Sequence, residues 1–391
     1  MEKLWNSNYL KVWGSNFMLH FSFTLIVPLL PLYLNQTYGA AKDTIGVVLA
    51  GYAVMALVVR PFSGYLTDVF PRKAALLLFN FFFVATYAGY IAAGSLTAFA
   101  IFRTLHGAPF GALTVATNAA AVDSLPQSRR TEGLGYFGLS NNLATAIGPM
   151  LAIYLLDALN GNFQALFTIS LGVSLLGLIL DASLKLPKAD FVREKKTLSL
   201  DKFFLMDAMP EAVTIALFSL AHGVMITYTA IYGRQYLGVT TGTGLFFTLF
   251  ATGLILSRLT GARALRKEKV SRNASIGIVI SIFGYTMFAL LQNELFYYIS
   301  AFVIGLGNGH WYPAFLNMFV NLADDSKRGA ANSSILTAWD AGKGLGVLLG
   351  GVISEHLGYM TAFTTGAASF VLGSAMYFAF TKAHYERTKL R

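Results

Sequence analysis

The sequence predicts an all-α membrane protein with twelve transmembrane helices in two pseudo-symmetric six-helix bundles. Three observations predict this fold class. The composition is too apolar for a soluble chain, twelve apolar runs are long enough to cross a bilayer, and several landmarks repeat at one fixed spacing. Together they indicate that these helices fold in a lipid bilayer.

The composition excludes a soluble or a disordered chain. The 391 residues are 55% hydrophobic and 12% charged, with a net charge of +10 and no cysteine. Soluble domains carry about 25% charged residues, so this chain has too little polar surface for water. Disordered chains are poor in aromatic residues, whereas 14% of this sequence is aromatic. Because the sequence has no cysteine, disulfides and thiolate chemistry are excluded.

The helices are predicted from runs of about 20 mostly apolar residues, the length that crosses a bilayer. The twelve runs are 10–34, 43–67, 74–94, 97–123, 131–157, 163–184, 207–235, 242–264, 272–291, 295–322, 330–356 and 360–381. Most breaks between them are short, so consecutive helices are expected to be antiparallel. One break is long and charged. It predicts an N-terminal bundle over 1–184, a cytoplasmic linker over 185–206 and a C-terminal bundle over 207–391.

The basic residues predict the orientation, because cytoplasmic loops of membrane proteins are enriched in Lys and Arg. With the N-terminus inside, 23 of the 29 Lys and Arg residues fall on the inside, and only Lys42 and Arg234 fall in outside loops. We therefore expect a multi-pass protein of the inner cell membrane with both termini in the cytoplasm. The basic excess reports topology and predicts no nucleic-acid partner.

An internal repeat relates the two halves. A shift of 198 residues places several landmarks on one another: Arg60 on Arg258, Gly107 on Gly305, Gly111 on Gly309, Arg130 on Arg328, Gly148 on Gly346, and Asn142 on Asp340. Two arginines and three glycines at one offset are improbable by chance. Many transporters are built from such repeats, with the substrate site near the bilayer midplane where the repeats meet.

The segment RPFSGYLTDVFPRK, between the second and third spans, resembles a loop signature of the major facilitator superfamily. Gly64, Asp68, Arg72 and Lys73 match the signature, and Pro71 stands where the family usually has glycine. The resemblance implies a gate latch in which the Asp68 carboxylate pairs with basic groups in one transport state. The alternative is a loop that only sets topology.

The fourth span supports the same resemblance with FRTLHGAPFG, in which Arg103 matches the family's intramembrane arginine. In the family this residue is thought to influence proton release from a neighbouring acid. An arginine at membrane depth is costly and normally faces a polar partner. Snorkelling of Arg103 to the outer interface is the alternative. The adjacent His106, beside Gly107, is expected to belong to a helix contact.

Four further residues are candidates for proton coupling. Asp340 lies well inside an apolar span, near Lys343, where burial and a cation act on its acidity in opposite directions. A fixed structural contact is the alternative role for Asp340. His20, His222 and His310 fall in spans 1, 7 and 10, which line the cavity in this fold, and histidine titrates near neutrality. Packing is the alternative role for each histidine.

Aromatic and amide residues in the same spans are candidates for the substrate cavity. They are Asn16, Asn118, Asn142, Tyr228, Tyr232, Trp311, Tyr312 and Trp339. Flat faces with a few hydrogen-bonding groups favour a moderately apolar, aromatic solute over a sugar or an inorganic ion. Aromatic residues are also common on lipid-facing surfaces. The glycines of span 11 and the Gly148-Pro149 pair of span 5 are expected to allow close helix packing.

The resemblance is greatest to the bacterial efflux branch of the superfamily, the multidrug and sugar-efflux-like proton antiporters. It implies the major facilitator fold and a secondary transporter that exports a small organic solute in exchange for protons by alternating access. A proton-independent facilitator or importer and a non-transporting receptor are the alternatives. The sequence has no phosphate-binding loop, nucleotide fingerprint or zinc-spaced histidine pair. We therefore expect no enzyme activity, no cofactor and no metal site.

Overall fold

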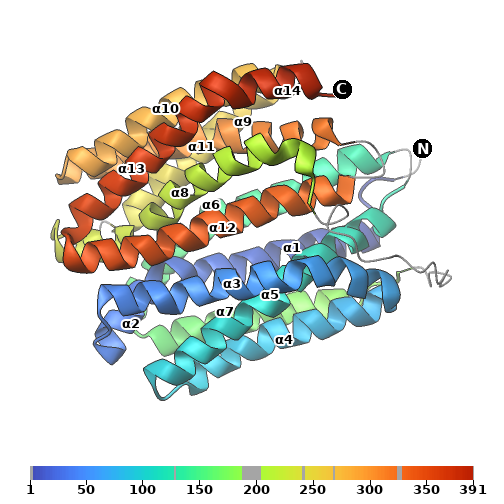
Figure 1. The fold of residues 1–391 in the computed structure, drawn as a ribbon. Helices are drawn as coiled ribbons and strands as arrows, with labels where there is room; N and C mark the ends of the chain where they lie inside the picture. Colours follow the sequence, from blue (N-terminus) through green and yellow to red (C-terminus); the bar gives the residue numbers. More distant parts are fainter. Residues whose placement is uncertain are drawn as a thin grey trace. The chain divides into compact units, whose positions relative to one another are not determined.

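The computed structural model describes residues 3–126, 129–186, 204–239, 243–266, 269–323 and 328–390 (Figure 1). These residues are mainly helical, and no strand occurs among them. The predicted all-α membrane fold with twelve long helical segments is confirmed.

The segments follow the order of the predicted spans. The first six are α1 (Ser7–Ile26), continued by a 3-10 turn (Val27–Leu29) and α2 (Leu30–Tyr38), then α3 (Lys42–Val69), α4 (Arg72–Ala92), α5 (Leu96–Ser124), α6 (Arg130–Ala158) and α7 (Phe163–Ala182). The second six are α8 (Met209–Gln235) after a short turn (Met206–Ala208), α9 (Thr243–Arg266), α10 (Val270–Leu290), α11 (Glu294–Leu322), α12 (Arg328–His356), and α13 (Gly358–Met376), continued by a π-helical turn (Tyr377–Thr381) and α14 (Lys382–Thr388). Figure 1 shows α13 and α14 as one continuous helical segment.

Polar residues in the short loops determine where several helices begin. Asn6, Ser95, Asn162 and Asn293 each precede a helix, and each side chain accepts a hydrogen bond from the backbone N–H three residues later. Such N-caps satisfy a backbone donor that the first turn of a helix leaves without a partner. These caps lie close to the predicted ends of the apolar runs.

The chain divides into two compact units. Unit 1 comprises residues 1–30 and 51–196, and unit 2 comprises residues 31–50 and 197–391. The segment 31–50, predicted in the N-terminal bundle, therefore groups with the second unit. There Lys42 donates from its backbone N–H to Glu355 (3.0 Å) and from Nζ to the carbonyl oxygen of Ser354 (3.2 Å). Most of the predicted linker, residues 187–203, lies outside the described residues.

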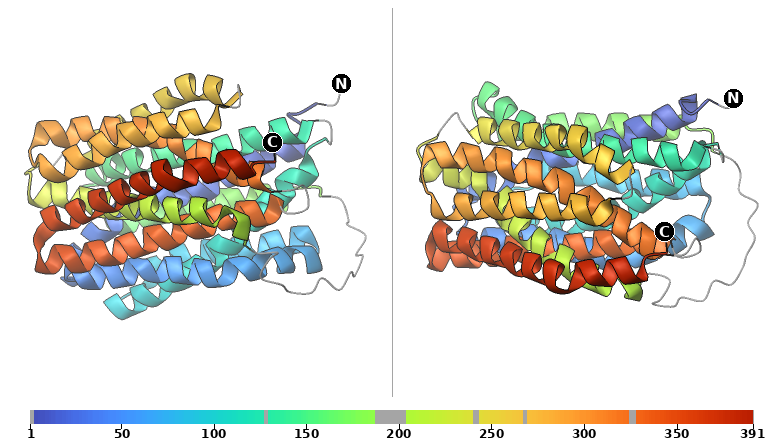
Figure 2. Two further views of the ribbon diagram at one scale, coloured as in Figure 1. Left: turned by 45° about the horizontal axis from the view of Figure 1, so that its top comes forward. Right: turned by 90° about the horizontal axis from the view of Figure 1, so that it is seen from above.

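The two units share one internal packing plan. In unit 1, α1 packs on α6 and α7, and α4 packs on α5 and α7. In unit 2, α8 packs on α12 and α13, and α10 packs on α11 and α13. These pairs are equivalent under the predicted repeat. Figure 2 shows the helices of unit 2, coloured from yellow-green to red, running side by side.

The repeat extends to individual contacts. A Cβ atom on Gly107 of α5 would lie closer than 3.0 Å to the carbonyl oxygen of Tyr52 in α3, and one on Gly305 of α11 would lie equally close to the carbonyl oxygen of Phe250 in α9. Each residue of the second pair is 198 positions after its counterpart. Both units therefore use a glycine at the same point to bring two helix backbones into contact.

Each unit begins and ends at the same end of its helices. In unit 1, Asn8 at the start of α1 exchanges two hydrogen bonds with the backbone of Lys185 after α7, at 2.8 and 3.1 Å. In unit 2, Glu211 at the start of α8 contacts His384 of α14 at 3.1 Å. A chain that returns to its starting end has crossed its unit an even number of times.

The outer faces of the helices are apolar. Large side chains such as Phe82 (52% exposed) and Phe283 (67% exposed) lie on the surfaces of their units. Eight helical runs in the described part of the chain are long and apolar enough to cross a membrane by length and composition. Helices α5, α8, α10 and α11 carry the buried polar groups from which the candidate site is built.

Candidate functional site

Backbone contact between α8 and α12 positions the candidate residues of unit 2. A Cβ atom on Gly342 or Gly346 of α12 would lie closer than 3.0 Å to a carbonyl oxygen of α8, and one on Gly223 of α8 would lie equally close to the carbonyl oxygen of Lys343. Small residues allow such approach where lipid supplies no hydrophobic driving force. The predicted packing role of the span 11 glycines is thereby confirmed at Gly342 and Gly346.

A buried network joins α8, α10 and α11. Asn308 accepts at Oδ1 from the indole N–H of Trp311 (3.0 Å) and from the hydroxyl of Ser281 (3.4 Å). The indole is only a donor, so Oδ1 must face it, and the amide Nδ2 of Asn308 then faces Nδ1 of His222 at 3.5 Å. We therefore assign the proton of neutral His222 to Nε2. Protonating Nδ1 would place two donors against each other.

His310 takes the opposite tautomer. Asn273 of α10 donates from Nδ2 to the backbone carbonyl oxygen of His310 (2.9 Å), so its Oδ1, at 2.8 Å from Nδ1 of His310, accepts. Nδ1 of His310 therefore carries a proton. A second proton on Nε2 of His310 would break neither of these bonds, which distinguishes this ring from His222.

Aromatic rings surround the network of unit 2. The indole of Trp339 on α12 lies 5.2 Å from the ring of His222, 4.8 Å from that of Tyr312 and 6.1 Å from that of Trp311, measured between ring centroids. Trp311 is fully buried, whereas Tyr312 and Trp339 are partly exposed. The structure thus brings four predicted residues of three helices into one cluster.

Asp340 and Lys343 lie on the same helix as this cluster, and both side chains are partly buried. The proton-coupling role of Asp340 remains a prediction.

Arg103 of unit 1 is 4% exposed and is enclosed by aromatic rings. Its guanidinium carbon lies 4.5 Å from the ring centre of Tyr52 and 5.3 Å from that of Phe23, and it donates a long hydrogen bond (3.5 Å) to the hydroxyl of Tyr90. Such cation–π contacts contribute about 2 kcal/mol when desolvated. Arg103 is thus held inside unit 1, and the structure gives no support to the snorkelling alternative.

His106 lies one turn further along α5 and is fully buried. Its Nδ1 is 2.7 Å from the hydroxyl of Tyr90 in α4. The rings of Phe83 and Tyr87 pack against it at 4.8 and 5.1 Å. His106 therefore belongs to the helix packing of unit 1, as the sequence predicts.

Four other polar candidates lie in unit 1. Asn16 donates to the hydroxyl of Ser140 (2.7 Å) and so joins α1 to α6. Nδ1 of His20 lies 3.0 Å from the carbonyl oxygen of Asn16, one turn earlier in α1. Asn118 of α5 and Asn142 of α6 are partly buried. The cavity roles of Asn16, Asn118 and Asn142 and the proton-coupling role of His20 remain predictions.

Tyr228 and Tyr232, predicted in the substrate cavity, take part in the packing of unit 2. Tyr228 donates to the carbonyl oxygen of Val347 (2.7 Å), which fastens α8 to α12. The ring of Tyr232 packs on those of Tyr359 (5.7 Å) and Phe363 (5.1 Å). Their cavity role remains a prediction.

The gate motif is described in part. For Gly64 and Asp68 the structure describes only the backbone, which belongs to α3. Arg72 forms an ion pair with Asp123 at the end of α5, and Lys73 donates to the carbonyl oxygen of Leu184 (2.8 Å). Both basic side chains therefore bind neighbouring segments of unit 1.

Two buried carboxyl groups escaped the sequence analysis. Asp181 of α7 and Glu211 of α8 are both fully buried. Asp181 accepts a hydrogen bond from Asn80 of α4 (2.6 Å). Both lie near the ends of predicted spans, where a carboxyl group is ordinarily solvated, so the apolar pattern gave no reason to single them out.

Two helical units with one packing plan, apolar outer faces and buried polar clusters define a multi-pass membrane transporter. Comparison with known proteins agrees. The Major Facilitator Superfamily profile matches residues 12–342 and 272–390. The chain belongs to this superfamily and is a transporter rather than an enzyme, as predicted.

Similar proteins include two bacterial relatives. One is the "Staphylopine export protein" of Staphylococcus aureus strain Mu50, 21% identical over 336 residues that cover 82% of this chain and 83% of the relative. Another is the "Multidrug resistance protein MdtG" of Escherichia coli strain SMS-3-5, 24% identical over 391 residues, with 95% and 94% covered. Among solved structures, a peptide transporter POT in complex with sulfate superposes with a TM-score of 0.77 at 15% identity, covering 98% of this chain and 96% of that one.

Proposed function

We propose that this protein exports a small, moderately apolar organic solute across the inner membrane in exchange for protons, by alternating access. The observation that carries the proposal is the similarity to an export protein and a multidrug resistance protein over at least 82% of this chain. One name refers to the export of staphylopine and the other to resistance to several drugs. We therefore propose export of an organic cargo, and experiment must identify that cargo.

The orientation belongs to the same proposal. The helices from α1 to α7 begin and end at one end of their set, as do those from α8 to α14, and a charged segment of the sequence lies between the two sets. Such a linker has no apolar run with which to cross the bilayer. Together with the basic residues of the inside segments, this supports a cytoplasmic location for both termini.

His310 and Asp340 are the proposed proton carriers. The bonds of His310 to Asn273 survive a second proton on its ring, whereas the bond of His222 to Asn308 does not. Asp340 supplies a partly buried carboxyl group on α12, the helix that also carries Trp339. A proton that crosses a potential of 100 mV releases about 2.3 kcal/mol, which is the energy available for export.

Trp339 and Tyr312 are the proposed contacts for the cargo. They are the partly exposed members of the aromatic cluster of unit 2, and their rings meet edge to face at 4.8 Å. Aromatic faces bind planar apolar solutes and organic cations. This supports a cargo with an aromatic or cationic group.

Flux in proteoliposomes tests the function. Purified protein is reconstituted, and transport of ethidium and of staphylopine is followed with and without an imposed pH gradient. We expect at least one probe to accumulate only when the gradient is present. Flux that ignores the gradient would refute proton coupling and support a facilitator. Binding of both probes without flux of either would refute transport of these cargoes.

The variant Asp340→Asn tests the carrier. It should leave downhill counterflow of the probe intact and abolish accumulation against a gradient, because an amide cannot take up and release a proton. The matched control is Asp207→Asn, which makes the same change at an exposed carboxylate before α8. Unchanged gradient-driven accumulation in Asp340→Asn would remove Asp340 from the mechanism.

A further inference from the structure

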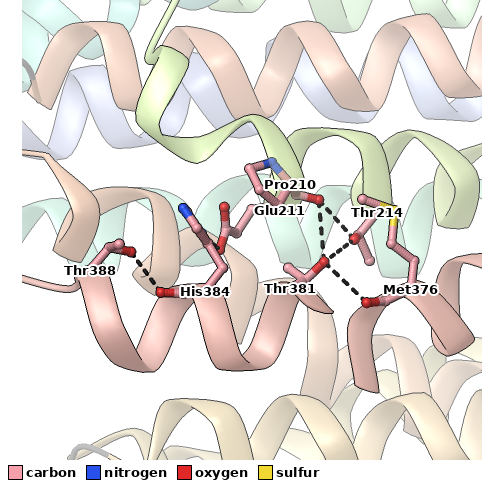
Figure 3. Close-up of polar contacts among 7 residues, drawn as sticks. All are labelled: Pro210, Glu211, Thr214, Met376, Thr381, His384 and Thr388. Atoms are coloured by element: carbon pink, nitrogen blue, oxygen red, sulfur yellow. Dashed lines mark hydrogen bonds and ion pairs between the residues drawn. The ribbon is translucent and has the colours of Figure 1, made fainter. Parts of the chain in front are cut away.

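A buried acid lies at the end of unit 2 where α8 begins, and the transport mechanism proposed above does not use it. The side chain of Glu211 is 0% exposed, and its Oε1 lies 3.1 Å from Nδ1 of His384, whose side chain is 22% exposed (Figure 3). The second oxygen, Oε2, has no hydrogen-bond partner among the described residues. The pair thus joins a water-excluded carboxyl group to an imidazole that solvent reaches.

His384 lies on α14, which polar contacts bind to three other helices. The contacts pair His384 with Glu211 of α8, Glu386 with Ser271 of α10, and Tyr385 with Asn321 of α11. The π-helical turn before α14 brings Thr381 within 2.9 Å of the hydroxyl of Thr214 on α8, next to the buried acid (Figure 3). Single π-helical turns occur frequently at functional sites.

Burial determines the charge that this pair can carry. A fully buried carboxylate with one side-chain hydrogen-bond partner is costly unless it is neutralised or paired with a cation. One proton meets the requirement in either of two arrangements, a neutral acid beside neutral imidazole or a carboxylate beside imidazolium. Both arrangements preserve the bond between Oε1 and Nδ1. The proton therefore belongs to the pair rather than to one residue.

Besides His384, the backbone N–H groups in the first turn of α8 lie near the Glu211 carboxyl group. The titratable side chains that sense its charge are Tyr377 of the π-helical turn and Tyr385 of α14. The other acid of α14, Glu386, is paired with Lys389 at 2.6 Å, and Lys382 also acts on it. His384 is the basic group that the described structure places in contact with Glu211.

We propose that Glu211 and His384 form a proton-binding site that fastens α14 to α8 while the proton is bound and weakens that contact when the proton leaves. The ligand is a proton from the aqueous phase beside the C-terminus. That phase is the cytoplasm if the proposed orientation holds. The contact is then strong at low pH and weakens as the pH rises past the point at which the pair releases its proton, because the carboxylate that remains is buried without a cation beside it.

Hydrogen exchange of the full-length protein in lipid nanodiscs tests the proposal without any transport measurement. After correction for the intrinsic pH dependence of exchange, amides of α14 should exchange about tenfold faster at about pH 9 than at about pH 6. In Glu211→Gln the neutral amide keeps α14 docked, so this difference in exchange rate between the two pH values (the exchange step) should disappear. The matched control Glu386→Gln removes the other acid of α14, which is 44% exposed, and should retain the step.

Infrared spectroscopy provides an independent readout. A C=O stretching band of a protonated carboxylic acid, or its replacement by an imidazolium signal, should follow the same pH step in the wild type. It should be missing from Glu211→Gln. An exchange step of equal size in Glu211→Gln, or α14 protection in the wild type that does not vary with pH, would overturn the proposal. Neither result bears on whether the protein transports solutes.

Discussion

Gly305 of α11 lies directly against the carbonyl group of Phe250 in α9, with no room for a side chain between them. The same arrangement occurs between Gly107 and Tyr52, 198 residues earlier. Both contacts are backbone to backbone, so neither neighbour can move aside by changing a rotamer. The equivalence ties the sequence repeat to the helix packing of each unit.

We predict that Gly305→Ala and Gly107→Ala each destabilise the protein by about 1–3 kcal/mol, because the added methyl group separates two helices. Thermal unfolding in detergent measures the effect. The control is Gly172→Ala in α7, where a Cβ atom meets nothing within 4 Å. There the higher helix propensity of alanine should leave stability equal or slightly raised. Equal stability of all three variants would contradict the packing assignment.

The two histidines of unit 2 should differ in proton coupling. We predict that His310→Gln abolishes gradient-driven transport, whereas His222→Gln keeps it. A second proton on the ring of His310 keeps its bonds to Asn273, whereas a second proton on the ring of His222 breaks its bond to Asn308. The pH profile of transport in proteoliposomes is the measurement. A profile altered by His222→Gln and unchanged by His310→Gln would show that the assigned proton positions are wrong.

The hydroxyl of Tyr90 supplies the described hydrogen bond of both Arg103 and His106. Tyr90→Phe should therefore cost about 1–3 kcal/mol, since it leaves a fully buried imidazole nitrogen without a partner. Thermal unfolding measures this loss against Tyr236→Phe, the same change at a side chain that is 58% exposed. A loss of equal size in the two variants would argue against a special role for Tyr90.

The ion pair between Arg72 and Asp123 separates the two interpretations of the gate motif. Arg72→Asp should reduce transport severalfold while the protein still inserts, and Arg72→Asp combined with Asp123→Arg should restore it. Rescue by the exchanged pair would show that the contact between the two side chains matters, because the double variant still carries Arg72→Asp and so still has the altered loop charge. Loss of the predicted topology in the single variant, detected by labelling of an engineered cysteine, would favour the topology role.

The fold was predictable because bilayer thickness fixes the length of a spanning helix, and caps such as Ser95 and Asn293 mark its start. The cluster of Trp311, Tyr312, Trp339 and His222 was predictable only as separate residues. Their proximity depends on how α8, α11 and α12 pack.

Contacts between residues that are far apart in the sequence could not be predicted from the pattern of apolar residues. Asn80 donates to Asp181 across 101 positions, and Glu211 meets His384 across 173. A periodic pattern reports which face of a helix is apolar and carries no information about the helix opposite. The same limit applies to residues 31–50, whose grouping with unit 2 depends on contacts such as that of Lys42 with Ser354.

The glycine seam between α8 and α12 has a mechanical consequence. Main chain rests on main chain at Gly223, Gly342 and Gly346, so α8 and α12 cannot shift past each other at these points by changing a rotamer, and Tyr228 bonds them a further time. We therefore expect the two helices to move as one rigid body, so that His222 and Trp339 keep their spacing. Quenching of Trp339 fluorescence by the neighbouring imidazole would then stay constant through a transport cycle.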